Sequence, residues 1–200
     1  MDNAAMFKLS YGLYVLSAKD GDKDNGCISN TVIQVTDVPF RMVVALNKDH
    51  FTTELIKKTG EFNVSVLDET VPFDVFKNFG FRSGRDYDKF EGIEYERTEN
   101  GIAYLTKNTN AVISGKVITT TDLGTHYLFL ADVADAKILS AVDSVTYTFY
   151  QKNIKPKPKD VPKKGYVCTV CGYIYEGEPL PPDFICPICK HDASVFEKIV

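Results

Sequence analysis

Four cysteines near the carboxyl end are the residues of this sequence best suited to bind a metal ion. They form two C-x-x-C pairs, Cys168 with Cys171 and Cys186 with Cys189, separated by 14 residues. Each pair can fold into a tight turn whose sulfur atoms diverge, so two pairs can place four thiolates around one tetrahedral ion. The spacing therefore predicts a single-metal site. Disulfides are the competing interpretation, which a reducing compartment and the two-residue gaps disfavour.

The ligand set by itself accepts either iron or zinc, because both ions take four thiolates in a tetrahedron. Residues 166–200 carry five acidic side chains against Lys190 and Lys198, whereas a zinc ribbon that binds nucleic acid usually exposes basic residues. Aromatic residues lie around the cysteine pairs at Tyr166, Tyr173, Tyr175, Phe184 and Phe196. An apolar shell with backbone N–H groups directed at sulfur suits a redox site. We therefore expect one iron ion, with structural zinc as the alternative.

This carboxyl-terminal segment resembles a rubredoxin domain. The matching stretches are YVCTVCGYIYEG at residues 166–177 and DFICPIC at residues 183–189. The short interval between the cysteine pairs is similar to the compact version appended to rubrerythrins, and the tryptophan of the longer form is absent. Lys190 stands where glycine is frequent, so a positive φ there would cost about 1 kcal/mol.

Composition and charge exclude several classes of protein. The 200 residues are 44% hydrophobic and 25% charged, with a net charge of -4, which is typical of a globular chain with a core. No apolar stretch approaches the roughly 18 residues of a membrane helix, and the first residues lack the pattern of a secretory signal. No broad basic face is available for nucleic acid. We therefore expect a cytoplasmic protein that binds neither nucleic acid nor membrane.

Residues 151–165 separate two acidic parts of the chain. This segment contains six lysines, one aspartate and three prolines. Proline removes hydrogen-bond donors and the lysines keep the backbone hydrated, so we expect a linker without a helix or a central strand. The predicted organisation is a domain over residues 1–150, a linker over residues 151–165 and a small domain over residues 166–200.

The larger part carries mostly the signals of strands. Alternating and apolar runs predict strands at residues 14–18, 27–36, 41–46, 62–67, 111–120, 127–133 and 146–150. A short helix capped by Thr52 or Thr53 and ended by Gly60 is predicted, with another over residues 71–79. The order is not a regular alternation of strands and helices, and no G-x-G-x-x-G follows a strand, which disfavours a Rossmann fold. We expect a closed or partly closed antiparallel barrel.

The same residues resemble the flavin reductase-like, FMN-binding split barrels. The resemblance rests on YGLYVLS at 11–17, NGCISNTV at 25–32, VTDVP at 35–39, NKDHFTTELI at 47–56, GEFNVSVL at 60–67 and DLGTH at 122–126. It implies a mainly β chain, in which an FMN-binding split β-barrel precedes a small rubredoxin-like metal-knuckle domain.

A flavin needs backbone donors and small polar side chains near its ring, and its phosphate needs N–H groups and a cation. Residues 26–31 supply the former, and the helix start with Lys48 supplies the latter. The resemblance assigns Gly26, Cys27, Ile28, Ser29, Asn30 and Thr31 to the ring and ribityl chain. It assigns Asn47, Lys48, Thr52 and Thr53 to the phosphate side, with Arg85 in support. Cys27 is interpreted as a small neutral residue rather than a reactive thiol.

His126 matches a family histidine near the nicotinamide site and is the candidate catalytic residue. Thr125 replaces the usual aspartate of that motif, and Ala131-Asp132 replaces a common Gly-Glu pair. A single histidine at the start of a strand can equally have a structural role. Both interpretations of His126 stay open at the level of sequence.

The fusion of the two parts resembles the high-molecular-weight rubredoxins of anaerobes. It implies that NADH, with NADPH as the less favoured donor, reduces FMN, and that single electrons pass to one iron ion and on to a flavodiiron oxygen or nitric oxide reductase. The resemblance also implies a homodimer. One alternative is an NAD(P)H:flavin reductase that releases reduced flavin or reduces peroxide or ferric ions, with an accessory tail. Another is a flavin- or zinc-binding regulatory module.

Overall fold

The protein divides into two compact units, Met1–Ile154 and Lys155–Val200. The computed structural model describes residues 3–156 and 164–199. The part of the predicted linker between residues 157 and 163 therefore lies outside the described residues. None of the helices within the described ranges is long and apolar enough to cross a membrane.

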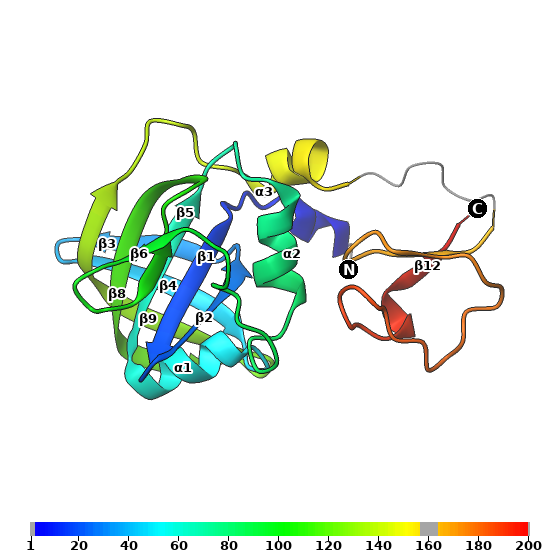
Figure 1. Cartoon of the computed structure of the whole chain (residues 1–200), viewed down its shortest axis with the longest axis horizontal. Helices are drawn as coiled ribbons and strands as arrows, with labels where there is room; N and C mark the ends of the chain where they lie inside the picture. Colours follow the sequence, from blue (N-terminus) through cyan, green and yellow to red (C-terminus); the bar gives the residue numbers. More distant parts are fainter. Residues whose placement is uncertain (1–2, 157–163, 200) are drawn as a thin grey trace. The chain divides into compact units, whose positions relative to one another are not determined.

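A single antiparallel sheet of seven strands forms the frame of the larger unit (Figure 1). Its strands follow the order β2-β1-β5-β8-β9-β4-β3, and every pairing is antiparallel. The sheet curls on itself, and its edge strands β2 and β3 leave the barrel split. The strands are β1 (Tyr14–Asp20), β2 (Lys23–Ser29), β3 (Val32–Asp37), β4 (Phe40–Asn47), β5 (Glu61–Leu67), β8 (Thr109–Asp122) and β9 (His126–Ile138).

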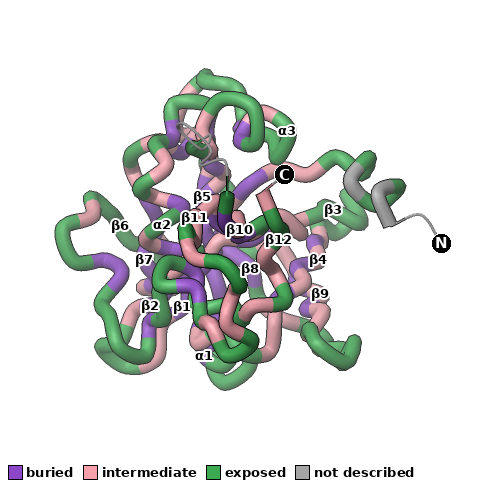
Figure 2. The backbone as a smooth tube through the Cα atoms, turned by 90° about the vertical axis from the view of Figure 1, so that its right-hand side faces the viewer, coloured by how far each residue is buried: buried purple, intermediate pink, exposed green. Residues whose placement is uncertain are grey.

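Alternate residues of β1 face two different cores. Leu16 points into the barrel, where Phe62 and Phe129 from other strands complete a fully buried cluster. Val15 points to the opposite face, where it packs against residues of helix α2 (Phe73–Phe81). The period of two along a strand explains this division, and the buried residues in Figure 2 lie along the strands while the turns are exposed.

Helix α1 (Phe51–Thr59) packs against β1 and β2 and closes one end of the barrel (Figure 1). Gly60 ends it as predicted, with a left-handed φ of 75° and its N–H bonded to Ile56. The N-cap is His50, whereas the sequence pointed to Thr52 or Thr53. Both threonines lie inside the first turn, where the hydroxyl of Thr52 accepts from Asn25 and that of Thr53 donates to the carbonyl of Asn47.

The predicted strand over residues 146–150 is wrong. Thr146 accepts a hydrogen bond at its Oγ1 from the N–H of Phe149 and caps helix α3 (Tyr147–Phe149). A π-helical turn, η2 (Tyr150–Ile154), follows directly. The aromatic composition suggested a strand, but helical geometry places the ring of Tyr150 4.4 Å from that of Phe76. The turn also runs into residues 151–154, where the sequence predicted no helix.

Two further differences concern strands. The predicted strand over residues 27–36 is divided, since β2 ends at Ser29 and β3 begins at Val32. The sequence also missed the short pair β6 (Tyr95–Arg97) and β7 (Ala103–Leu105), whose three-residue length gives no clear period. A 3-10 helix, η1 (Asn3–Lys8), precedes β1.

The smaller unit has a three-stranded sheet of order β11-β10-β12. Its elements are β10 (Tyr166–Cys168), β11 (Ile174–Tyr175), the 3-10 turn η3 (Ala193–Val195) and β12 (Phe196–Lys198). The only buried hydrophobic residues in its described part are the four cysteines. A unit of this size without an apolar core of its own requires another source of stability.

Candidate metal and flavin sites

The two cysteine pairs form knuckles with the same backbone hydrogen bonds. In the first, Gly172 donates its N–H to the carbonyl of Cys168 at 2.8 Å. In the second, Lys190 donates its N–H to the carbonyl of Cys186 at 2.9 Å. Both donors have a left-handed backbone, with φ of 78° and 62°. The positive φ considered for Lys190 on the basis of sequence is therefore present.

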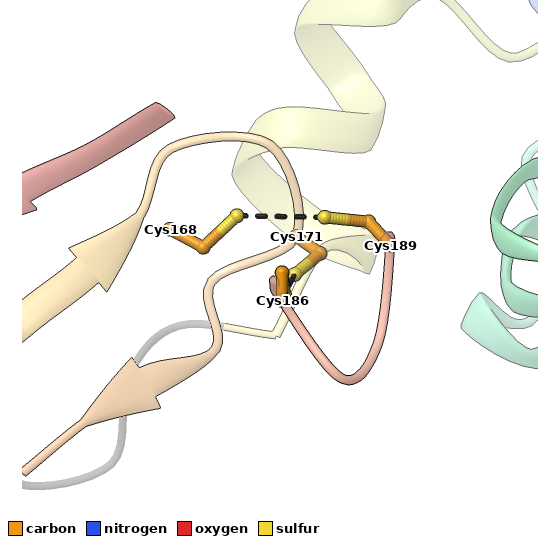
Figure 3. Close-up of side chains that lie close together, drawn as sticks. All are labelled: Cys168, Cys171, Cys186 and Cys189. Atoms are coloured by element: carbon orange, nitrogen blue, oxygen red, sulfur yellow. Dashed lines mark hydrogen bonds between the residues drawn. The ribbon is translucent and has the colours of Figure 1, made fainter. Parts of the chain in front are cut away.

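The four sulfur atoms converge from two facing loops (Figure 3). All lie within 4.8 Å of one another, and the Cys168–Cys189 and Cys171–Cys186 pairs are 3.5 Å apart. Metal–sulfur bonds of about 2.3 Å in a tetrahedron require sulfurs about 3.8 Å apart. These spacings exceed the roughly 2.05 Å of a disulfide bond, and the ligand set fits one ion.

Backbone N–H groups point at the sulfurs as a thiolate site requires. Tyr173 donates to Cys171, and His191 donates to Cys189. Phe184 lies at the centre of the predicted aromatic shell, with ring centroids 4.6 Å from Tyr175, 5.4 Å from Phe196 and 6.3 Å from Tyr173. Such hydrogen bonds and a partly apolar shell stabilise a charged metal–thiolate centre.

The free edge of β2 carries the first part of the predicted flavin site. The carbonyl of Gly26 accepts a hydrogen bond from Lys89, so it points away from β1. Residues of an antiparallel strand alternate in direction, so Ile28 turns its N–H and C=O to the same edge. A Cβ at Gly26 would lie 3.0 Å from Phe79, which explains the glycine. Cys27 faces the barrel interior, and burial raises the pKa of its thiol, consistent with a neutral residue.

The end of β2 is tied to β4 by two hydroxyl groups. Ser29 Oγ and Thr31 Oγ1 lie 3.1 Å apart, and Thr31 Oγ1 donates to the carbonyl of Ala45 at 2.6 Å. This link breaks the strand between residues 29 and 32. It brings the predicted ring segment, including Asn30, to within two residues of Asn47 on β4.

The predicted phosphate and nicotinamide residues meet at the end of β4. Asn47 pairs with His126 across β4 and β9, and the N–H of Lys48 bonds to the carbonyl of Thr125 at 3.1 Å. His126 is exposed, with Nδ1 2.8 Å from Thr125 Oγ1. The Lys48 ammonium pairs with Asp122 at 2.5 Å, so this charge is partly neutralised.

Thr52 and Thr53 are buried, and their hydroxyls contact protein groups. Thr52 Oγ1 accepts from Asn25 Nδ2 at 2.9 Å, and Thr53 Oγ1 donates to the carbonyl of Asn47 at 2.8 Å. The start of α1 has no side-chain cap. The N–H groups of His50, Thr53 and Glu54 bond to backbone carbonyls, so the N–H groups of Phe51 and Thr52, rather than the threonine hydroxyls, are suited to receive an anion.

Arg85 reaches the same helix from a distant loop. Its guanidinium pairs with Glu54 and lies 5.2 Å from the ring centroid of Phe51. A cavity of about 940 Å³ opens beside it, with six carboxylates on its walls against the three cations Lys23, Arg85 and Arg97. Of the predicted cofactor residues, all of which the structure describes, only Arg85 lines this cavity.

Three polar residues near this site, the buried Asn25 and Lys89 and the exposed His50, carry no signal in the sequence. Asn25 is 1% exposed, and its Oδ1 has no hydrogen-bond partner in the described part of the chain. Desolvation and then the charges of Lys89 and His126 hold the pKa of His50 below its usual range. Burial lowers the pKa of Lys89 to about 8. A lysine among acidic residues looks like a surface residue, so no pattern in the sequence could have identified Lys89.

Residues 6–157 match the model of the flavin reductase like domain. The chain belongs to the flavin reductase-like family. Residues 166–197 match the rubredoxin-like domain of rubrerythrin. Both resemblances found in the sequence are thereby confirmed, as is the mainly β architecture followed by a four-cysteine knuckle unit.

The relatives agree with this assignment. The chain is 37% identical to a high molecular weight rubredoxin of Moorella thermoacetica, and the match covers all of both chains. It is 38% identical to a ferric-chelate reductase (NAD(P)H) of Archaeoglobus fulgidus, over 78% of this chain and 93% of that protein. The fold is similar, with a TM-score of 0.64 at 20% identity, to an NADH:FAD oxidoreductase of Streptomyces globisporus in complex with NAD and FAD fragments, covering 71% of this chain and 83% of that one.

These findings define the general class of the protein. A flavin reductase domain joined to a rubredoxin-like domain makes an electron-transfer oxidoreductase. The family implies a flavin for the barrel, and the four-cysteine knuckles imply iron for the smaller unit.

Proposed function

We propose that this flavin reductase-like protein carries electrons from NADH, or less readily NADPH, through FMN in the barrel to one iron ion in the smaller unit. The iron then passes them to an acceptor protein. The observation that carries the proposal is the union, in one chain, of the flavin reductase domain with a convergent four-cysteine site. A flavin accepts a hydride as two electrons and can release them singly, whereas iron takes one electron at a time.

The residues of the barrel fit a bound flavin mononucleotide. The edge strand β2 leaves the backbone N–H and C=O of Ile28 without a partner among the described strands, while the carbonyl of Gly26 is taken by Lys89, and the hydroxyls of Ser29 and Thr31 stand at the end of the strand. We assign these groups to the ring and ribityl chain. The uncapped start of α1, with Lys48 and Asn47 before it, is assigned to the phosphate.

His126 is assigned to the nicotinamide. It stands beside Asn47 at the start of β9, exposed and with one ring nitrogen engaged by Thr125. Its other nitrogen is available to orient a carboxamide or ring on the flavin face. Arg85, through Glu54 and Phe51, holds the neighbouring loop against α1 and supports the site from outside.

The smaller unit supplies the one-electron site. Cys168, Cys171, Cys186 and Cys189 hold the ion, and the N–H groups of Tyr173 and His191 stabilise thiolate charge. Because the backbone already directs these donors at sulfur, both charge states of iron can be held with little rearrangement.

The visible spectrum with metal analysis of the purified full-length protein tests the proposal. Flavin bands together with ferric–thiolate absorption and about one iron per chain are expected from the single ligand set. Zinc in place of iron would favour the regulatory module and contradict electron transfer. Absence of flavin after incubation with FMN would contradict the role of the barrel.

Rapid mixing with NADH tests the order of events. The flavin absorption should bleach first and the ferric–thiolate absorption second. Substituting Cys168→Ser should abolish electron delivery to an external acceptor while leaving flavin reduction intact. Ser194→Ala, an exposed change in the same unit, is the control and should leave both steps unchanged. Equal loss of both steps in Cys168→Ser would contradict the division of labour.

We propose a homodimer as the working form. The edge strand β3 and the turn after it expose Ile33, Val35, Val38 and Phe40, an apolar set that is unusual on a free edge strand. Sedimentation at micromolar concentration tests this, and a monomer would contradict it. The acceptor we propose is a flavodiiron-type reductase, as the likeness to high-molecular-weight rubredoxins implies.

A second function is favoured by one specific observation. The Archaeoglobus relative, which matches 78% of this chain, is named a ferric-chelate reductase. Direct reduction of ferric chelates by the barrel would not need the cysteines. Ferric-chelate reduction that survives Cys168→Ser at full rate would support this alternative.

A further inference from the structure

Lys89 is a buried cation without an acidic partner. It is 4% exposed, and no ion pair joins it to a carboxylate within residues 3–156 or 164–199. Its ammonium donates instead to two backbone carbonyls, of Gly26 at 2.9 Å and of Phe79 at 3.0 Å. A buried charge is costly unless it is paired, so a lysine left in this position indicates a negative group that completes the site.

The position of Lys89 identifies that negative group. Its ammonium lies at the free edge of β2, where the ring segment of the flavin is assigned, and Cys27 and His50 are within its electrostatic range. The carbonyl of Phe79 belongs to the last turn of α2, so Lys89 also holds this helix end beside the strand. An ammonium has three donors, and the two carbonyls use two of them.

We propose that Lys89 is a positioning residue whose positive charge stabilises the negative charge that the flavin ring gains on reduction. This inference rests on the proposed function. A hydride from the dihydronicotinamide carries two electrons and one proton to the ring, and the nicotinamide leaves as its oxidised cation. The ring thereby gains one negative charge. A fixed cation at its edge favours this reduced form over the neutral oxidised form.

The contacts favour the ring over the phosphate as the group that Lys89 serves. Gly26 begins the ring segment, whereas the phosphate side is assigned to Lys48 and the start of α1. A cation beside the phosphate would strengthen the binding of oxidised and reduced FMN equally, because the phosphate charge does not change on reduction. A cation beside the ring would strengthen the binding of reduced FMN selectively.

The test compares dissociation constants of oxidised and reduced FMN for the full-length protein and for Lys89→Met. In Lys89→Met the dissociation constant of reduced FMN should rise about tenfold relative to that of oxidised FMN. This is the size expected for a unit charge within roughly 10 Å in a partly buried site. Riboflavin, which lacks the phosphate, should show the same shift. Lys89→Arg should retain the ratio. If Lys89→Met does not fold, Lys89→Gln, which keeps a neutral polar donor in place of the charge, carries the same test.

Asn78→Ala is the matched control for a purely structural role. Asn78 Nδ2 donates to the carbonyl of Lys89 at 2.6 Å, so its loss loosens the same segment without removing the charge. The ratio of dissociation constants should not change in this variant. An unchanged ratio in Lys89→Met, with normal flavin binding, would overturn this inference and leave the proposed function intact. If Lys89→Met weakened the binding of FMN but not that of riboflavin, the result would overturn the inference and indicate that Lys89 serves the phosphate. Failure of the unaltered protein to bind flavin would overturn the proposed function itself.

Discussion

Gly172 and Lys190 occupy equivalent positions in the two cysteine knuckles, each with a left-handed backbone and each donating its N–H to the carbonyl of the first cysteine of its pair. One is a glycine, for which this backbone conformation is free of strain. The other carries a Cβ that makes the same conformation unfavourable. The smaller unit therefore contains one relaxed and one strained copy of the same turn.

Substituting Lys190→Gly should stabilise the metal-loaded smaller unit by about 0.5–1 kcal/mol, because glycine removes the strain at positive φ. Loss of the metal–thiolate absorption in guanidinium measures this directly on the full-length protein. The reciprocal change, Gly172→Ala, should destabilise by a similar amount, since no atom crowds that position and only φ opposes the side chain. Equal stability of Lys190→Gly and the unaltered protein would contradict this explanation.

Removing the metal should unfold the smaller unit and leave the barrel folded. The four cysteines are the only buried hydrophobic residues in its described part, so the ion replaces an apolar core. Burial raises the pKa of Cys171 and, to about 11, that of Cys189, so metal binding must displace protons. Metal affinity should therefore fall as the pH falls. Circular dichroism during chelation at pH 7 and pH 5 checks this, and a smaller unit that keeps its structure without metal would refute it.

The buried Lys89 should make stability depend on pH in an unusual direction. Burial lowers its pKa to about 8 from 10.5, so between these values the unfolded chain binds more protons than the folded one. Stability then rises with pH in this window, by up to about 3 kcal/mol relative to Lys89→Met. Urea unfolding of both proteins from pH 7 to pH 10 measures the difference. Comparing the two proteins reduces the opposing effect of Cys27 on the pH dependence of stability, because both proteins retain this residue. Parallel curves would contradict the burial of a charged lysine.

Substituting Gly84→Ala should destabilise the barrel by about 2 kcal/mol. A Cβ at this position would overlap Asn25 Oδ1, and the buried amide cannot move without losing its bond to Thr52. Gly80→Ala is the control, because its Cβ meets only Ile28 at 3.4 Å within a helix, where alanine is favoured by about 0.5–1 kcal/mol. Thermal unfolding should separate the two variants in opposite directions. An unchanged melting temperature in Gly84→Ala would contradict this prediction and show that the loop adjusts freely.

Much of the fold could be predicted because its signals are local. Polar and apolar residues alternate along most of the strand that contains Phe62, and Gly60 ends α1 where the sequence predicted. The prediction of a strand over residues 146–150 was wrong because Thr146 can begin a strand or cap a helix. The choice was made by the packing of Tyr150 on Phe76, which are 74 residues apart in sequence and invisible to a local pattern.

The metal ligands could be identified from the spacing of the cysteines alone, because each C-x-x-C pair builds its knuckle from backbone bonds within a few residues. The burial of Lys89, by contrast, and the hydrogen bond from its ammonium to Gly26, 63 residues away, depend on how the chain folds in three dimensions. That contact exists because α2 ends beside the free edge of β2, an arrangement fixed by the burial of Phe79. Residue spacing is enough to predict local geometry, whereas the environment of a charge depends on which distant parts of the chain exclude water around it.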